Sequence, residues 1–535
     1  MNKALCNFIF IAIISLVFIN CANRGTPQGG PKDIEPPKIL KSEPENFSTN
    51  FTETEIKIYF NEFIKIKDLQ KQLIISPPMD PQPEITPLGG ANKYITIKIT
   101  DTLEANTTYA FNFGNSIVDN NEENPYPFYR YVFSTGDYID SLTVKGQVFD
   151  ALEKQPDDFV SVVLYEVDST FTDSIIYKKP PKYVTNTLDS LTTFTIENIK
   201  AGQYMLLALK DGNQDYKFQQ KLDKIGFYKS FINVPTDSIY NLKLFKEDIE
   251  FNATRPSLVS SEKIAFGYEG DYQGMNINML SETPEDFEYT ITKDEKADTL
   301  YYWYKPKLEV DSLVFNVTKD DFTKDFTLKI RSKEQDTLKI NPKTTGNINF
   351  GESYKISAST PFNAFDESKI SIMDKDSLAV DFKTSFDSIT NIVALDFEKT
   401  ESNNYKIQLL PNSLTDFYGV SNDTLNLSIR TKAFSDYGNV RVSLQNAKYP
   451  IIVQLTDEKG EVKAELFSEE PKFFDFRYVS PGKYLLRVIF DANGNKKYDT
   501  GSYLKKLQPE RVSYYPEMID VRANWDEIRE FILLD

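Results

Sequence analysis

The chain of 535 residues, with a formal net charge of −18, is too long for one hydrophobic core and too acidic for a nucleic-acid-binding protein, which phosphate would repel. It contains no histidine, which excludes serine–histidine catalysis and histidine-ligated zinc. Glycosidase chemistry on paired carboxylates stays open, but the sequence does not single out one pair among 79 acidic residues.

The first twenty residues have the layout of a secretory signal. Lys3 supplies the positive charge, and the apolar stretch over residues 8–19 is too short to span a bilayer comfortably as a mature helix. A flexible tether, rich in Gly and Pro, is predicted over residues 21–38 and begins at Cys21. Because Cys6 would leave with the signal, Cys21 would be the single cysteine of the mature protein, and no disulfide is expected.

From residue 55 onward, apolar and polar residues alternate in short runs, as they do in strands with one buried face. Examples are EIKIYF (55–60), YITIKIT (94–100) and TLNLSIR (424–430), and turn clusters rich in Pro and Asn separate such runs. A helical turn is expected only near residues 525–531. The pattern predicts an all-β protein made of several sandwiches.

Two kinds of module occur twice. YAFNFGNSIVD (109–119) is similar to YKIQLLPNSLTD (405–416), and FTIENIKAGQYMLLALKDGNQD (194–215) matches FDFRYVSPGKYLLRVIFDANGN (474–495) without a gap. An unrelated β module lies between the copies. The predicted domains are a signal peptide (1–20), the tether (21–38), a first sandwich (39–138), a second (139–249), a third of uncertain type (250–345), a degenerate second copy of the first (346–437) and a second copy of the second (438–535).

A loop in the last module offers oxygen ligands. Asp491, Asn493, Asn495 and Asp499 would surround a calcium ion if alternate residues of a tight loop pointed to one centre. The EF-hand pattern is not met, since Gly494 stands at the fourth position and no Glu closes the loop. The alternative is that the Asp and Asn side chains only cap their own backbone.

The most aromatic stretch is YYWY, residues 301–304. On a strand, Tyr301 and Trp303 share one face. If exposed, that face would stack on a sugar or a partner protein; if buried, it is part of the core.

Several segments resemble known families. FINC (18–21) resembles a lipobox, the site where bacterial lipoprotein signal peptidase cuts before a lipid-modified cysteine. Residues 36–137 resemble the bacterial Ig-like domain described from S-layer proteins. The residues that carry this resemblance are Pro36, Pro37, Ile39, Leu103, Thr107, Tyr109, Ile117, Asp119, Phe133, Thr135 and Gly136.

The repeated second module has a family resemblance of its own. Gly202-x-Tyr204 and Gly482-x-Tyr484 resemble the G-x-Y strand of transthyretin-like, carboxypeptidase-regulatory-type sandwiches. The opening CANRGTPQGGPKD resembles that of Bacteroidota lipoproteins that carry an Ig-like domain. The expected fold class is therefore all-β, with tandem Ig-like and transthyretin-like sandwiches.

These resemblances imply an outer-membrane lipoprotein, attached through Cys21, that acts by binding or spacing and is not an enzyme. Ala22, directly after the cysteine, implies release to the outer membrane, and both the periplasmic and the cell-surface side stay open. No cofactor is expected apart from the calcium considered above. The expected partners are envelope proteins, in an outer-membrane machine for protein assembly or secretion. The alternative is a glycan-binding lipoprotein, and a carboxylate-dependent hydrolase is a third hypothesis.

Overall fold

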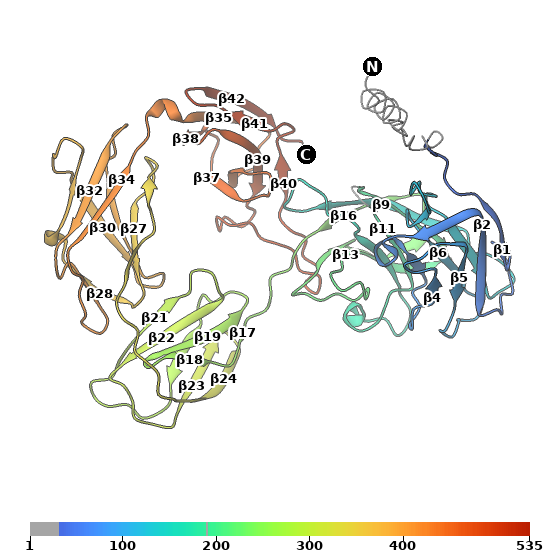
Figure 1. Cartoon of the computed structure of the whole chain (residues 1–535), viewed down its shortest axis with the longest axis horizontal. Coiled ribbons are helices and arrows are strands. Elements are labelled where there is room, and N and C mark those ends of the chain that lie inside the picture. Colours follow the sequence, from blue (N-terminus) through green and yellow to red (C-terminus); the bar gives the residue numbers. More distant parts are fainter. Residues whose placement is uncertain (1–31, 189–190, 535) are drawn as a thin grey trace, which may run out of the picture. The chain divides into compact units, whose positions relative to one another are not determined.

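The computed structural model describes residues 32–188 and 191–534. Within this part, almost every regular element is a strand (Figure 1), apart from one helical turn, α2 (Leu69–Gln72), and three short 3-10 turns. The all-β prediction is confirmed. The signal, Cys21 and most of the tether lie outside the described residues.

One sequence prediction of local structure is wrong. Residues 525–531 do not form a helical turn, because strand β42 (Asp526–Ile532) lies there and pairs in parallel with β35 (Gly438–Gln445). Phe531 is buried in the sandwich core, at 5% exposed. Pairing and burial thus override the helix propensity of Glu and Arg in this segment.

The chain divides into two compact units. Of the described residues, the first unit contains 32–143, Lys182–Leu188 and Ile196–Ala201, and the second contains the others. The strands before residue 142 are β1 (Ile39–Glu43), β2 (Glu55–Ile66), β3 (Ile74–Ser76), β4 (Glu84–Thr86), β5 (Asn92–Lys98), β6 (Thr108–Asn112), β7 (Ile117–Asp119) and β8 (Arg130–Ser134).

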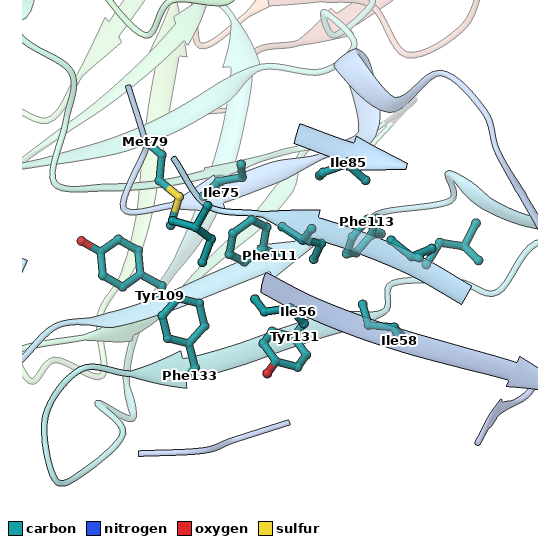
Figure 2. Close-up of a cluster of buried hydrophobic side chains, with 14 of the residues drawn as sticks. Ile56, Ile58, Ile75, Met79, Ile85, Tyr109, Phe111, Phe113, Tyr131 and Phe133 are labelled. Atoms are coloured by element: carbon teal, nitrogen blue, oxygen red, sulfur yellow. The ribbon is translucent and has the colours of Figure 1, made fainter. Parts of the chain in front are cut away.

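These strands form a sandwich of two sheets, ordered β1-β2-β5-β4 with β7 on β2, and β3-β6-β8. Ile56 and Ile58 of β2 stand opposite Ile97 and Ile95 of β5, and all four side chains are fully buried. They meet the aromatic side chains of β6 and β8 between the sheets (Figure 2). The period-2 pattern of the sequence therefore specifies the buried face correctly.

The remaining strands continue along the chain in four groups. From 142 to 244 they are β9 (Leu142–Asp150), β10 (Ser161–Glu166), β11 (Tyr183–Asn186), β12 (Thr193–Ile199), β13 (Gly202–Lys210), β14 (Lys224–Phe227), β15 (Ile232–Val234) and β16 (Ile239–Leu244). From 252 to 329 they are β17 (Asn252–Ala253), β18 (Ser257–Ser260), β19 (Lys263–Glu269), β20 (Asn276–Met279), β21 (Glu288–Lys293), β22 (Thr299–Lys305), β23 (Ser312–Lys319) and β24 (Phe322–Lys329).

The third group runs from 340 to 430 and the fourth from 438 to 532. The third contains β25 (Ile340–Pro342), β26 (Gly346–Asn347), β27 (Tyr354–Ala358), β28 (Phe362–Phe365), β29 (Ile370–Met373), β30 (Phe382–Asp387), β31 (Ile392–Phe397), β32 (Asn404–Leu409), β33 (Leu414–Asp416) and β34 (Leu425–Arg430). The fourth contains β35, β36 (Ile451–Thr456), β37 (Val462–Ser468), β38 (Phe474–Val479), β39 (Gly482–Phe490), β40 (Val512–Tyr514), β41 (Ile519–Val521) and β42.

The first repeated pair shares a polar network as well as a sequence pattern. The hydroxyl of Tyr109 accepts the N–H of Glu104 at 2.9 Å, and that of Tyr405 accepts the N–H of Thr400 at 2.7 Å. The hydroxyls of Thr135 and Thr431 donate to the carbonyls of those same residues, Glu104 and Thr400, at 2.7 and 2.6 Å. The same interior bonds therefore recur at the same spacing, although little sequence is shared outside the repeat.

The second repeated pair shares its strand order. Strands β10, β13 and β14 are neighbours in one sheet with β15 on β13, and β36, β39 and β40 are neighbours with β41 on β39. In both copies the first and last strands pair in parallel, β9 with β16 and β35 with β42. The ungapped match in the sequence thus reflects one fold used twice.

Within the second unit, a loop of the last module packs on the 139–249 segment. Tyr503 is fully buried, its N–H donates to the Glu247 carboxylate, and its ring centroid lies 5.6 Å from that of Phe227. A Cβ at Gly501 would lie 2.5 Å from the Phe245 ring, so only glycine fits there without movement. The two copies of the second module are therefore joined by a packed contact.

Burial leaves one carboxylate in the third group poorly satisfied, and this gives a pH prediction. Glu262 is 7% exposed, its Oε2 has no hydrogen-bond partner among the described residues, and burial raises its pKa above 4.5. The folded state then holds the proton of Glu262 more tightly than the unfolded chain does. The free energy of unfolding therefore falls as the pH rises from about 4.5 through the higher pKa of the folded state.

Glu262→Gln is expected to stabilise the fold at pH 8 by about 1 kcal/mol, because it removes a buried charge that lacks a full set of partners. The gain should vanish well below pH 4.5, where the carboxyl is protonated in both the folded and the unfolded state. Denaturant titration followed by tryptophan fluorescence would measure it. An equal gain at both pH values, or none at either, would contradict the assignment.

Candidate functional site

The predicted lipidation site, Cys21, lies outside the described residues. In the described part of the chain, no helix combines the length and the apolar composition that crossing a bilayer requires. Attachment through Cys21 stays a prediction.

The predicted aromatic binding face is buried at Trp303 and half-buried at Tyr301. Trp303 is 2% exposed, and its Nε1 donates to Thr292 Oγ1 at 2.8 Å. The Nζ of Lys263 lies 4.0 Å from the ring centroid of Tyr301 and 4.4 Å from that of Trp303, so a side chain of the protein already covers this face. The binding-surface prediction is wrong for Trp303, because β22 lies between β19 and β21 and its rings pack against those neighbours.

The structure brings the four predicted calcium ligands together in one loop. Asp491 is fully buried, and its carboxylate accepts the N–H groups of Gly494, Asn495 and Lys496 at 2.8, 3.1 and 2.8 Å. The side-chain amides of Asn493 and Asn495 donate to Asp499. These bonds give the loop the cap geometry that the alternative interpretation expects.

A fifth residue, Glu510, completes this loop and was missed from the sequence. Its carboxylate accepts the N–H groups of Ala492 and Asp499 at 2.7 and 3.0 Å, and burial raises its pKa. In the earlier copy, Asp223 accepts the N–H groups of Gly212 and Gln219 at 2.9 and 2.7 Å. A spacing rule could not identify Glu510 and Asp223 as equivalent, because the loop from Asp491 to Glu510 differs in length from the loop from Asp211 to Asp223.

Calcium at this loop stays a prediction. Among the described residues, no group of three or more His, Cys, Asp or Glu side chains is arranged to hold a metal ion. If calcium binds, 1 mM EDTA should lower the thermal midpoint, since a ligand present at 100 times its Kd stabilises by about 2.7 kcal/mol. Asp499→Asn should abolish the shift. An unchanged midpoint in EDTA would leave the loop as a backbone cap alone.

Strands β35, β38 and β42 form the three-stranded sheet of the last module (Figure 1). A groove of about 410 Å³ lies over this sheet. We call it the carboxy-terminal groove. Val440 and Val442 of β35 point into the core, so the alternating residues of this strand face outward. The side chains that line the groove include Asn439, Arg441, Asp475, Arg477, Asp526 and Ile528.

Fixed polar contacts hold this surface in shape. Arg441 donates to both oxygens of Asp475, at 2.6 and 2.9 Å, and this pairing lowers the pKa of Asp475. Asn439 donates to Asp526 at 2.7 Å and accepts the N–H of Tyr478 at 3.1 Å. These contacts order the charges that line the groove.

Apolar side chains remain exposed beside these charges. Ile528 is 70% exposed and Phe473 is 64% exposed, with the Arg441 guanidinium 5.5 Å from the Phe473 ring centroid. Exposed apolar groups next to paired charges are typical of protein interaction surfaces. The sequence could have indicated Ile528 only if residues 526–532 had been recognised as a strand.

Comparison with known proteins adds a family for one segment. Comparison with curated proteins found no match. Among solved structures, the surface layer protein SbsC (domains 1–6) aligns with 90% of this chain and 67% of its own at 11% identity and a TM-score of 0.17. The Bacillus anthracis TIE protein aligns with 100% and 79% at 10% identity and a TM-score of 0.15. Scores this low support no inference about function.

The family of bacterial Ig-like domains matches residues 33–135, which is the segment that forms the first sandwich.

Proposed function

We propose that the protein is a lipid-anchored envelope scaffold, an accessory subunit of a larger outer-membrane complex for protein assembly or secretion. The observation that carries this proposal is the preformed carboxy-terminal groove, exposed on one of several tandem β-sandwiches. The bacterial Ig-like match over residues 33–135 supports a role at the cell envelope. Binding surfaces on rigid sandwiches fit an interaction protein better than an enzyme.

The finer points of the proposal rest on the sequence. The two copies of the second module are proposed to be transthyretin-like, and the protein is proposed to be a Bacteroidota lipoprotein. The anchor at Cys21, with the tether to residue 38, would leave the sandwiches free to reach partners. This holds whether the anchor lies on the periplasmic or on the cell-surface side of the outer membrane.

Purification of the native protein from gently solubilised membranes tests the proposal. A scaffold subunit is expected to co-purify with one or more envelope proteins at a fixed ratio. A protein that elutes alone at its own mass, in mild detergent and low salt, would contradict it.

The anchor has a test of its own. Cys21→Ala is expected to abolish the incorporation of a labelled fatty acid into the protein, because no thioether-linked lipid can then form. Cys6→Ala is the matched control and should incorporate the label as the unaltered protein does, since Cys6 would leave with the signal. Label in the Cys21→Ala protein would contradict lipid attachment at this residue.

A further inference from the structure

Strand β42 forms an open edge of the sheet beneath the carboxy-terminal groove. The sheet order is β38-β35-β42, and within the described residues β42 pairs with β35 alone. A strand at a sheet edge carries a row of unpaired N–H and C=O groups that another strand can extend. Its length, seven residues, is sufficient for such pairing.

Two backbone hydrogen bonds show which residues of β42 face the open side. The carbonyl of Trp525 accepts the N–H of Asn439, and the N–H of Leu533 donates to the carbonyl of Gln445, each at 3.0 Å. Odd-numbered residues of the strand therefore point their backbone groups toward β35. Because successive residues alternate, Ile528 and Glu530 point theirs toward the open side.

The side chains along this edge are apolar and acidic in turn. Asp526, Ile528, Glu530 and Ile532 share the outer face, and the two isoleucines are 70% and 51% exposed. Over β42, three acidic residues outnumber the single Arg529, which gives the strand a net charge of −2. Exposed isoleucines on an edge are a liability that proteins normally avoid. Their presence indicates that something covers them.

We propose that β42 binds an extended segment of a partner protein in which every second residue, those on the outer face, is basic and apolar in turn, and that this segment adds a strand to the sheet. The proposal rests on the scaffold function proposed above and names its partner's chemistry. Lys or Arg side chains of the segment would lie beside Asp526 and Glu530, and its apolar side chains beside Ile528 and Ile532. A second copy of this chain fits poorly, because two edges of charge −2 would repel each other.

The test uses the full chain purified in detergent and an eight-residue capped peptide, Lys-Thr-Val-Thr-Lys-Thr-Val-Thr, labelled for fluorescence anisotropy, in which Lys and Val follow each other on one face of the strand. The peptide is expected to bind, and the same peptide with Glu for Lys is expected to bind at least fivefold more weakly. Equal binding of both peptides, or no binding of the Lys peptide at 1 mM, would overturn the proposal.

Variants locate the binding. Glu530→Lys should weaken the Lys peptide roughly fivefold, while Glu285→Lys, an exposed loop position with the same change of net charge, should leave it unchanged. Glu530→Pro removes an N–H on the open side and should weaken binding about tenfold or more. Unchanged thermal midpoints would show that the variants fold. If Glu530→Pro does not fold, Ile528→Lys replaces it and should also weaken binding of the Lys peptide.

The outcomes separate this proposal from the scaffold function. If light scattering shows a dimer that Glu530→Pro converts to monomer, the occupant is a second copy and the basic-segment proposal is wrong. If the peptide fails to bind while envelope proteins still co-purify at a fixed ratio, the partner docks elsewhere and only this inference falls. If the peptide binds as expected but nothing co-purifies, the scaffold function falls instead.

Discussion

Phe133→Ala is expected to destabilise the bacterial Ig-like sandwich by about 3–5 kcal/mol, the range for removing a buried aromatic side chain. Phe133 is fully buried, and its ring centroid lies 3.9 Å from that of Phe51 and 5.4 Å from that of Tyr109 (Figure 2). The ring joins β8 to Tyr109 of β6 and to Phe51, which precedes β2, so its loss leaves a cavity that rigid strands cannot close.

Hydrogen exchange read by mass spectrometry would measure this effect locally. Peptides from β6 and β8 should lose protection, while peptides from residues 438–534 should keep theirs. Phe63→Ala is the matched control, because Phe63 is 53% exposed and its removal should cost under 0.5 kcal/mol. Equal effects of the two substitutions would contradict the core assignment.

The second large effect is expected at Tyr503. Tyr503→Ala should weaken the contact between the two copies of the second module by about 3–5 kcal/mol, because it removes a fully buried ring packed against Phe227. Limited proteolysis should then cut residues 500–508 far faster than in the unaltered protein.

Tyr503→Phe separates packing from hydrogen bonding. It keeps the ring and removes only the hydroxyl, which lies 3.2 Å from the Asp173 carbonyl, so a loss of about 1 kcal/mol is expected. If Tyr503→Ala leaves the cleavage rate unchanged, the loop does not pack on the 139–249 segment in solution.

Local patterns carry much of the fold. The alternation in residues 55–60 correctly places Ile56 and Ile58 in a core, because a strand with one buried face has a period of two. The sequence likeness of residues 109–119 and 405–416 is accompanied in the structure by the same hydrogen bonds to Tyr109 and Tyr405. The same rule fails for residues 525–531, where a parallel partner decides the structure and the apolar spacing mimics a helix.

The candidate sites depend more on long-range contacts, which the sequence does not display. The sequence left open whether Trp303 is an exposed platform or part of the core, and the structure buries it on a central strand beside Lys263. Glu510 joins the Asp491 loop only through the fold, across 18 residues. The carboxy-terminal groove likewise needs strands from residues 438, 474 and 526 to meet in one sheet. Periodicity predicts which way a side chain points, but not which strand lies beside it.

The most direct test of the account is photo-crosslinking in intact cells, with a benzophenone amino acid in place of Ile528 at the groove. The control carries it in place of Leu378, which is 64% exposed on a different module. The account predicts one or a few adducts of defined mass from position 528 and none of these from position 378. If neither variant forms an adduct, or if both form the same adducts, the result would contradict the claim that the protein works by contact through its carboxy-terminal groove.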